Sequence, residues 1–183
     1  MDAPRIVVDT NALLNLATPV ADGRPMAPSG EDPLKAVLTA YDVHVPDSVL
    51  GEVTEATGGD DLLAAAADAV LLASGHLTAH VVDHDCDGSP PAGLDQGEAD
   101  AIRLANELSA AMFVTDEFNS TNYLLVARAI EDRNTLFTTP HVLCHLAESG
   151  VLDPRYVDAA LTYFVDTKAW DETYVDALRR AYL

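Results

Sequence analysis

Four acidic residues stand where the sequence predicts that they could act on one ligand. Asp9 and Asp116 each follow a short apolar run, RIVV and AMFVT, that is typical of a buried parallel strand. Ligands of open α/β sheets bind outside the carboxyl ends of the strands, so we expect both side chains at that edge. Glu52 and Glu98 lie in the first turns of two predicted helices and can point the same way.

A group of carboxylates in this position favours binding of a hard divalent cation. An unpaired carboxylate is costly to bury, and Mg²⁺ or Mn²⁺, which prefer oxygen ligands and keep several waters, would remove that cost. Glu98 by itself could equally be an acid that stabilises the start of its helix. In a chain with so many acidic residues, most acids are solvated surface groups. Whether these four form a metal site is therefore judged from the order and context of the motifs that contain them.

Apolar strands and amphipathic helices alternate along the chain. The predicted strands span 5–9, 43–46, 77–82, 111–116 and 135–138. The predicted helices span 12–17, 34–41, 47–57, 62–73, 94–110, 121–131 and 141–149, with two more in 154–183, and 18–33 and 83–93 are predicted loops. This alternation predicts a three-layer α/β domain with a mostly parallel sheet.

The order of four short segments resembles that of the PIN-domain nucleases. The segments are VVDTN at 7–11, PDSVLGEV at 46–53, GEADAIRLA at 97–105 and VTDE at 114–117. The resemblance covers roughly residues 5–149. It implies a Rossmann-like α/β/α PIN domain over residues 1–150. Residues 151–183 lie outside it and are interpreted as a C-terminal helical extension that packs on the same domain.

The resemblance implies metal-dependent hydrolysis of RNA phosphodiester bonds. The residues that match the family's acids are Asp9, Glu52, Glu98 and Asp116. Of these, Asp9, Glu98 and Asp116 would hold one or two Mg²⁺ or Mn²⁺ ions. Glu52 would complete the site or orient the attacking water. Supporting positions near the metal are Asn11, Glu117 and Asn119.

The chain carries a large excess of negative charge. Its 183 residues include 30 Asp and Glu against 10 Lys and Arg, a formal net charge of −20. This charge excludes attraction of nucleic acid by a generally basic surface, so RNA would be reached through the metal ions or through local arginines. The candidate arginines are Arg5, Arg24, Arg103 and Arg128. Because the acids are scattered, we interpret them as an adaptation to a salty, halophilic cytoplasm; a basic partner is the alternative.

The sequence also bounds location and partners. No signal peptide or membrane-spanning run is predicted, and two cysteines, Cys86 and Cys144, suit a reducing compartment. We therefore expect a cytoplasmic protein without a membrane partner. The family resemblance and the amphipathic tail suggest a homodimer. Within a ribonuclease function, two roles stay open: a toxin with an antitoxin protein as partner, and an RNA-processing enzyme.

Three alternatives remain beside this hypothesis. HVLCH at 141–145 places two histidines and a cysteine on one helix face and could bind zinc. HVVDHDCD at 80–87 is richer in metal-binding side chains but lies where a strand meets a loop. The alternative function is a PIN-fold protein without catalysis that serves as a binding or assembly module.

Overall fold

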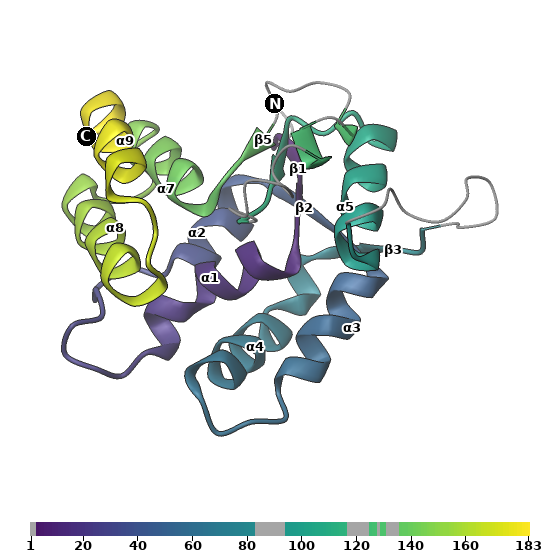
Figure 1. The fold of residues 1–183 in the computed structure, drawn as a ribbon, viewed down its shortest axis with the longest axis horizontal. Coiled ribbons are helices and arrows are strands. Elements are labelled where there is room, and N and C mark those ends of the chain that lie inside the picture. The colour runs from purple at the N-terminus through teal and green to yellow at the C-terminus, as the bar shows by residue number, and fades with distance from the viewer. Residues whose placement is uncertain (1–2, 83–93, 117–124, 128, 131–135) are drawn as a thin grey trace.

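Five parallel strands form one sheet at the centre of the protein (Figure 1). The structure is a computed structural model that describes residues 3–82, 94–116, 125–127, 129–130 and 136–183. The strands are β1 (Arg5–Val8), β2 (Asp42–Pro46), β3 (Thr78–His80), β4 (Met112–Val114) and β5 (Leu136–Phe137). Their order is β3-β2-β1-β4-β5, with every neighbouring pair parallel. The chain builds outward from β1 to β3 and then crosses back, so the order reverses between β1 and β4.

Helices cover both faces of this sheet. The helices whose bounds the structure gives are α1 (Thr10–Ala21), α2 (Pro33–Ala40), α3 (Asp47–Ala56), α4 (Leu62–Leu72), the 3₁₀ turn η1 (Ser74–His76), α5 (Gln96–Glu107), α7 (Thr139–Glu148), α8 (Pro154–Lys168) and α9 (Glu172–Tyr182). In Figure 1, α5 lies on one side of the strands and α1, α2 and α7 lie on the other. The fold is therefore α/β with a parallel sheet, as the alternation of the sequence predicts.

The two cores follow from the alternation of side chains along each strand. Ile6 and Val8 point into the larger core, which they share with α1, α2 and α7, whereas Val7 points to the other face. There it packs with Phe113 and Ile102 in a smaller core under α5. Because both faces are covered at the centre of the sheet, β1 and β4 carry nearly continuous apolar runs, whereas β2 and the exposed edge strand β3 include polar residues.

Several predicted boundaries differ from the observed ones by one to three residues, and the largest difference is at the end of α1. The predicted loop at 18–33 begins too early, because α1 continues through Pro19 to Ala21. Proline lacks the N–H that a helix interior needs, yet Thr18 and Pro19 are both buried, and the Thr18 hydroxyl donates to the Leu14 carbonyl at 2.7 Å. Burial of this turn keeps the helix intact past the point where the local sequence predicts its end.

The C-terminal helices α8 and α9 pack on α7 and extend the larger core. A polar cluster fastens α8 to the end of α1. Tyr163 of α8 donates its hydroxyl to the buried Asp22 at 2.5 Å, and Arg24 donates to both oxygens of the same carboxylate at 2.6–3.0 Å. The hydrogen bonds from Arg24 hold the pKa of Asp22 well below its usual range, against the effect of burial.

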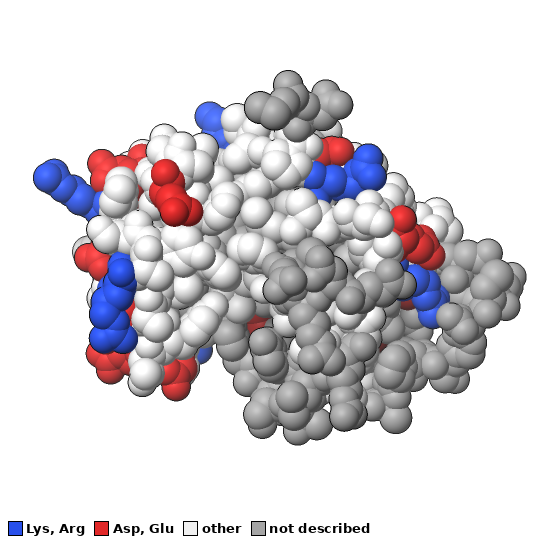
Figure 2. Space-filling model, turned by 90° about the horizontal axis from the view of Figure 1, so that it is seen from above, with Lys and Arg blue, Asp and Glu red and all other residues white. Residues whose placement is uncertain are grey.

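The surface carries both signs of charge. On the face shown in Figure 2, acidic and basic side chains lie around the outer part, and a wide uncharged area lies between them. The acids thus form no single patch on this face. Among the helices that the structure describes, none is long and apolar enough to cross a membrane.

Candidate active site at the carboxyl ends of β1 and β4

The point at which the strand order reverses is where α/β sheets of this kind bind ligands. Here it lies between β1 and β4, and each of these strands leads directly toward an acid. Val8 pairs with Val114, and the Asp9 N–H donates to the Val114 carbonyl at 3.0 Å. Asp9 and Asp116 therefore leave the sheet from neighbouring strands at the same edge.

Asp9 is held by the helix that follows it. It is 4% exposed, and its Oδ1 accepts the N–H of Ala12 at 2.7 Å, which makes it the N-cap of α1. The positive end of the helix dipole favours the ionised carboxylate at this position. The same arrangement explains locally why α1 begins immediately after β1.

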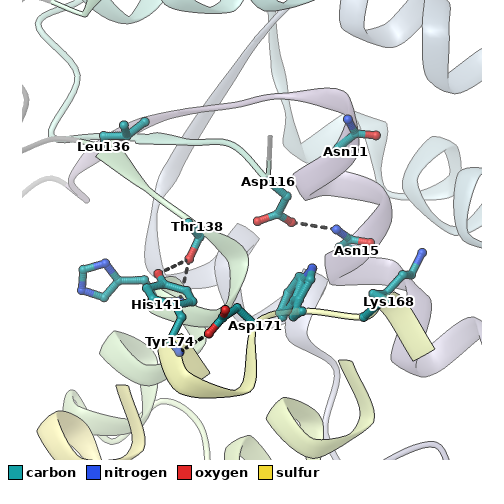
Figure 3. A pocket seen from close by; sticks show the side chains of 11 residues that line it. Asn11, Asn15, Asp116, Leu136, Thr138, His141, Lys168, Asp171 and Tyr174 are labelled. Carbon is teal, nitrogen blue, oxygen red and sulfur yellow. Dashed lines mark hydrogen bonds between the residues drawn. The ribbon is translucent and has the colours of Figure 1, made fainter. Parts of the chain in front are cut away.

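Asp116 is held by two elements that are distant from it in sequence. Its Oδ2 accepts from the Asn15 amide at 2.7 Å (Figure 3) and from the Thr139 hydroxyl at 2.6 Å. Its Oδ1 accepts the Thr139 N–H at 2.8 Å. Burial raises the pKa of Asp116, and these hydrogen bonds together with nearby Lys168 partly oppose that effect. A bound cation would act in the same direction as the hydrogen bonds, because it favours the charged form.

Glu52 lies where α1, α3 and α5 converge. The Thr10 hydroxyl, at the start of α1, donates to the Glu52 carboxylate. A Cβ added at Gly97, in the first turn of α5, would lie 2.2 Å from Glu52 Oε1. Glycine at position 97 is therefore what lets the carboxylate lie against the start of α5.

Two acids in the first turns of α5, Glu98 and Asp100, have different surroundings. Glu98 is partly exposed, and its Oε2 accepts the Asp95 N–H at 3.0 Å while Asp95 accepts the Glu98 N–H, which is a capping box. Asp100 is only 2% exposed and accepts from Ser48 at 2.9 Å and from Gln96 at 2.8 Å. The buried acid of this helix, facing α3, is thus Asp100.

Sequence reasoning missed Asp100 because it assigned too narrow a buried face to α5. The apolar spacing along 94–110 predicts a buried face of Ala99, Ile102, Ala105 and Leu108, but Ala101 and Leu104 are buried as well. Asp100 lies four residues before Leu104, a helical spacing that could have identified its position.

A cavity of about 900 Å³ opens beside Asp116. Its described lining comes from α1, the end of β4, β5, α7 and the junction of α8 with α9: Asn11, Asn15, Asp116, Leu136, Thr138, His141, Lys168, Ala169, Trp170, Asp171 and Tyr174. Figure 3 shows the hydrogen bond between Asn15 and Asp116 at this cavity, with Lys168 on the same side as Asn15. The sequence offered no signal for the residues from the tail, because they lie outside the motifs that define the resemblance.

The donor chemistry at this edge suits a hard cation. Asp9 and Asp116 offer carboxylate oxygens, and Mg²⁺ is commonly held by one or two carboxylates together with several waters. Within the part of the chain that the structure describes, no three His, Cys, Asp or Glu side chains are grouped so that they could hold a metal. The supporting positions Glu117 and Asn119 lie outside the described residues.

The HVLCH segment is used for packing on α7. His141 Nε2 lies 2.8 Å from the Tyr182 hydroxyl, and His145 Nδ1 lies 3.0 Å from the Tyr41 hydroxyl. Cys144 between them is fully buried, and burial raises its pKa to about 11. The three side chains thus have separate surroundings, which disfavours the zinc alternative. Most of the second segment, 83–87, lies outside the described residues.

The candidate arginines for RNA binding differ in the residues that they contact. Arg24 is committed to Asp22, and Arg5 lies 4.0 Å from Asp42 and donates to the Leu108 carbonyl at 3.4 Å. Arg103 lies on α5, and Arg128 lies outside the described residues. None of the contacts of Arg5 and Arg24 is at the cavity.

No protein-family model, curated protein or solved structure matches this chain. A function therefore has to be argued from the site and from the order of its motifs.

Proposed function

We propose that this protein is a divalent-metal-dependent ribonuclease built on a PIN-type domain. The observation that carries the proposal is the pair Asp9 and Asp116, which leave neighbouring parallel strands where the strand order reverses, beside a cavity of about 900 Å³. Two carboxylates at such an edge suit Mg²⁺ or Mn²⁺. The PIN family itself is proposed from the four sequence segments.

In this mechanism, Asp9 and Asp116 would hold the ion together with waters, and the ion would activate a water and neutralise charge on the phosphate. Glu98, which the sequence predicts as a third ligand, caps the start of α5 and is not grouped with these two acids in the described residues. The protein's own side chains orient the carboxylates that would bind the ion. Asn15 and Thr139 fix the Asp116 carboxylate through three hydrogen bonds. Side chains fixed in this way need no reorganisation when a substrate arrives.

Glu52 has a positioning role in the same proposal. Its carboxylate is bound by Thr10, the residue that follows Asp9, and lies against the first turn of α5. It can therefore accept a hydrogen bond from a water near Asp9. Asp100, buried between α3 and α5, holds these two helices together through Ser48.

The alternative is a PIN-fold protein that binds or assembles without catalysis. One observation favours it: both oxygens of Asp116 already accept hydrogen bonds from the protein. This alternative expects Asp116→Asn to change neither metal binding nor RNA turnover. Within the ribonuclease proposal, the toxin role requires an antitoxin protein that inhibits cleavage, whereas an RNA-processing role does not. A homodimer is proposed for either role.

The test is cleavage of a mixed RNA pool in molar KCl with Mn²⁺, by wild type and by Asp116→Asn. We expect metal-dependent cleavage by wild type and a loss on the order of a hundredfold or more in the variant. The matched control is Asp68→Asn, which removes an exposed acid from α4 and leaves cleavage unchanged.

Calorimetric titration with Mn²⁺ gives a second readout. Wild type and Asp68→Asn should bind the ion, and Asp116→Asn should bind it more weakly. Circular dichroism establishes that each protein is folded. Cleavage retained by folded Asp116→Asn, or absent from folded wild type in the presence of Mn²⁺, contradicts the proposal.

A further inference from the structure

The C-terminal helices supply one wall of the cavity beside Asp116. Helix α8 ends at Lys168, and Ala169 takes a left-handed conformation with φ of 53° that reverses the chain. Asp171 then caps α9 by accepting the Tyr174 N–H at 2.8 Å. This short junction places Lys168 and Trp170 in the lining together with residues that follow β1 and β4 (Figure 3).

Lys168 is an unusual residue to find in this place. The chain has only two lysines and a net charge of −20. Among the described residues that line the cavity, Lys168 is the one lysine or arginine. It forms no ion pair with any carboxylate that the structure describes. Partial burial lowers its pKa and nearby Asp116 opposes that effect.

The two carboxylates of the cavity are already engaged by the protein. Asp116 accepts three hydrogen bonds from Asn15 and Thr139, and Asp171 accepts the N–H of Tyr174. The ammonium group of Lys168 is therefore available to an anionic group of a ligand.

Aromatic rings complete this wall, and they are held in place from behind. Trp170 stacks on Phe164 with ring centroids 4.5 Å apart. The hydroxyl of Tyr174 lies 2.7 Å from the Thr138 hydroxyl. A cation beside fixed aromatic rings is the combination by which proteins bind single-stranded nucleic acid, with phosphate at the cation and a base against a ring.

We propose that the α8–α9 junction is a nucleotide subsite, in which Lys168 contacts a phosphate of single-stranded RNA and a base packs against the parts of Trp170 and Tyr174 that line the cavity. The identity of the ligand rests on the proposed function, whereas the subsite itself rests on the cavity. The inference gives the C-terminal helices a role in substrate binding that the sequence motifs do not include.

The chain offers a direct probe of this cavity, because Trp170 is its single tryptophan. A short single-stranded oligoribonucleotide is titrated into the protein in EDTA, so that binding is measured without cleavage. Tryptophan fluorescence should change saturably. Lys168→Gln should raise Kd about tenfold, the effect of losing one charged contact.

The salt dependence gives a second, independent number. Across a series of KCl concentrations, Lys168→Gln should flatten the slope of log Kd against log[KCl] by about 0.7, one phosphate contact on a single strand. Lys35→Gln is the matched control, since it removes the other lysine, which is exposed on α2 and outside this cavity. Its Kd and slope should equal those of wild type. Lys168→Arg, which keeps the charge, should restore most of the affinity.

Three outcomes overturn the inference. They are no fluorescence change with folded wild type, equal Kd values for Lys168→Gln and Lys35→Gln, and binding of inorganic phosphate as tight as that of the oligonucleotide, which would leave a simple anion site. Cleavage distinguishes this inference from the proposed function. Binding that depends on Lys168 without Mn²⁺-dependent cleavage supports the subsite and contradicts the ribonuclease proposal. Mn²⁺-dependent cleavage together with a Kd that Lys168→Gln leaves unchanged supports the ribonuclease proposal and contradicts the subsite.

Discussion

At the residue scale, the candidate site depends on carboxylates that accept hydrogen bonds from the first turns of helices. Asp9 caps α1, and Asp116 accepts the N–H and the hydroxyl of Thr139, the first residue of α7. In a parallel α/β fold every such helix begins at the edge where ligands bind, so the positive ends of helix dipoles gather there. The helix starts therefore favour the ionised form of both carboxylates at this edge of the sheet.

Gly97 allows a test of how closely Glu52 must lie against α5. Gly97→Ala would place a Cβ 2.2 Å from Glu52 Oε1, so the carboxylate must swing away and give up its contact with Thr10. We expect RNA cleavage to fall. The free energy of unfolding should change little, because alanine gains about 1 kcal/mol of helix propensity over glycine and so offsets the lost contact.

The control for this variant is the same substitution in a chain that already carries Glu52→Ala. With the carboxylate removed, Gly97→Ala should stabilise the protein by about 0.5–1 kcal/mol in urea unfolding in molar KCl. Equal effects of Gly97→Ala in the two backgrounds would mean that Glu52 does not lie against α5 as described.

At the element scale, the sequence predicts most of the fold, because strands and helices here carry their pattern locally. The strand segments end in acids or turn residues, and the helices begin at capping residues such as Asp61 and Asp95. The extension of α1 through Pro19 was not predictable, since it depends on burial against other elements. The helical spacing of Asp100 to Leu104 could have indicated its burial, but its partner Ser48, on another helix, could not be predicted locally.

The contribution of the tail to the cavity was also beyond prediction. Lys168 lies near Asp116 only because α8 and α9 pack on α7, and no local pattern in 151–183 predicts that packing. The predicted positions of Asp9 and Asp116 at one edge, in contrast, follow from the parallel sheet alone.

The cluster of Asp22, Arg24 and Tyr163 makes the attachment of α8 dependent on pH. Hydrogen bonds from Arg24 depress the pKa of Asp22 below the ordinary value of 3.8, so the folded state favours the ionised form more than the unfolded chain does. Its contribution to stability is therefore complete above about pH 4 and is lost as the pH falls below that value. We expect Asp22→Asn to lower the free energy of unfolding by about 1–3 kcal/mol at neutral pH.

The test is the difference in the free energy of unfolding between wild type and Asp22→Asn as the pH falls. The two unfolding free energies, measured by urea in molar KCl, should converge below pH 4. Asp158→Asn, which removes the exposed partner of Arg179, should keep a nearly constant and small difference from wild type in the neutral range. A difference for Asp22→Asn that stays constant with pH would show that ionisation of Asp22 does not fasten α8.

At the scale of the whole molecule, the negative charge makes stability and RNA binding respond to salt in opposite directions. A formal charge of −20 repels itself in the compact state, and about 1 M salt reduces the screening length to about 3 Å. Stability should therefore rise with KCl, whereas binding of RNA phosphates should weaken with it. If both hold, cleavage passes through a maximum at an intermediate salt concentration.

Melting temperatures measured between about 0.1 M and about 1 M KCl test whether stability rises with salt. A gain of roughly 2 kcal/mol would raise Tm by about 4–8 °C in a chain of this size. A variant with Glu55→Gln, Asp60→Asn and Asp68→Asn loses three exposed negative charges and should show a smaller rise, with a higher Tm at the low-salt end. Sucrose, which stabilises folded proteins without screening charge, should shift both proteins equally. A Tm that is independent of KCl in wild type would mean that the acids are balanced locally, and the salt maximum of cleavage would then have to disappear as well.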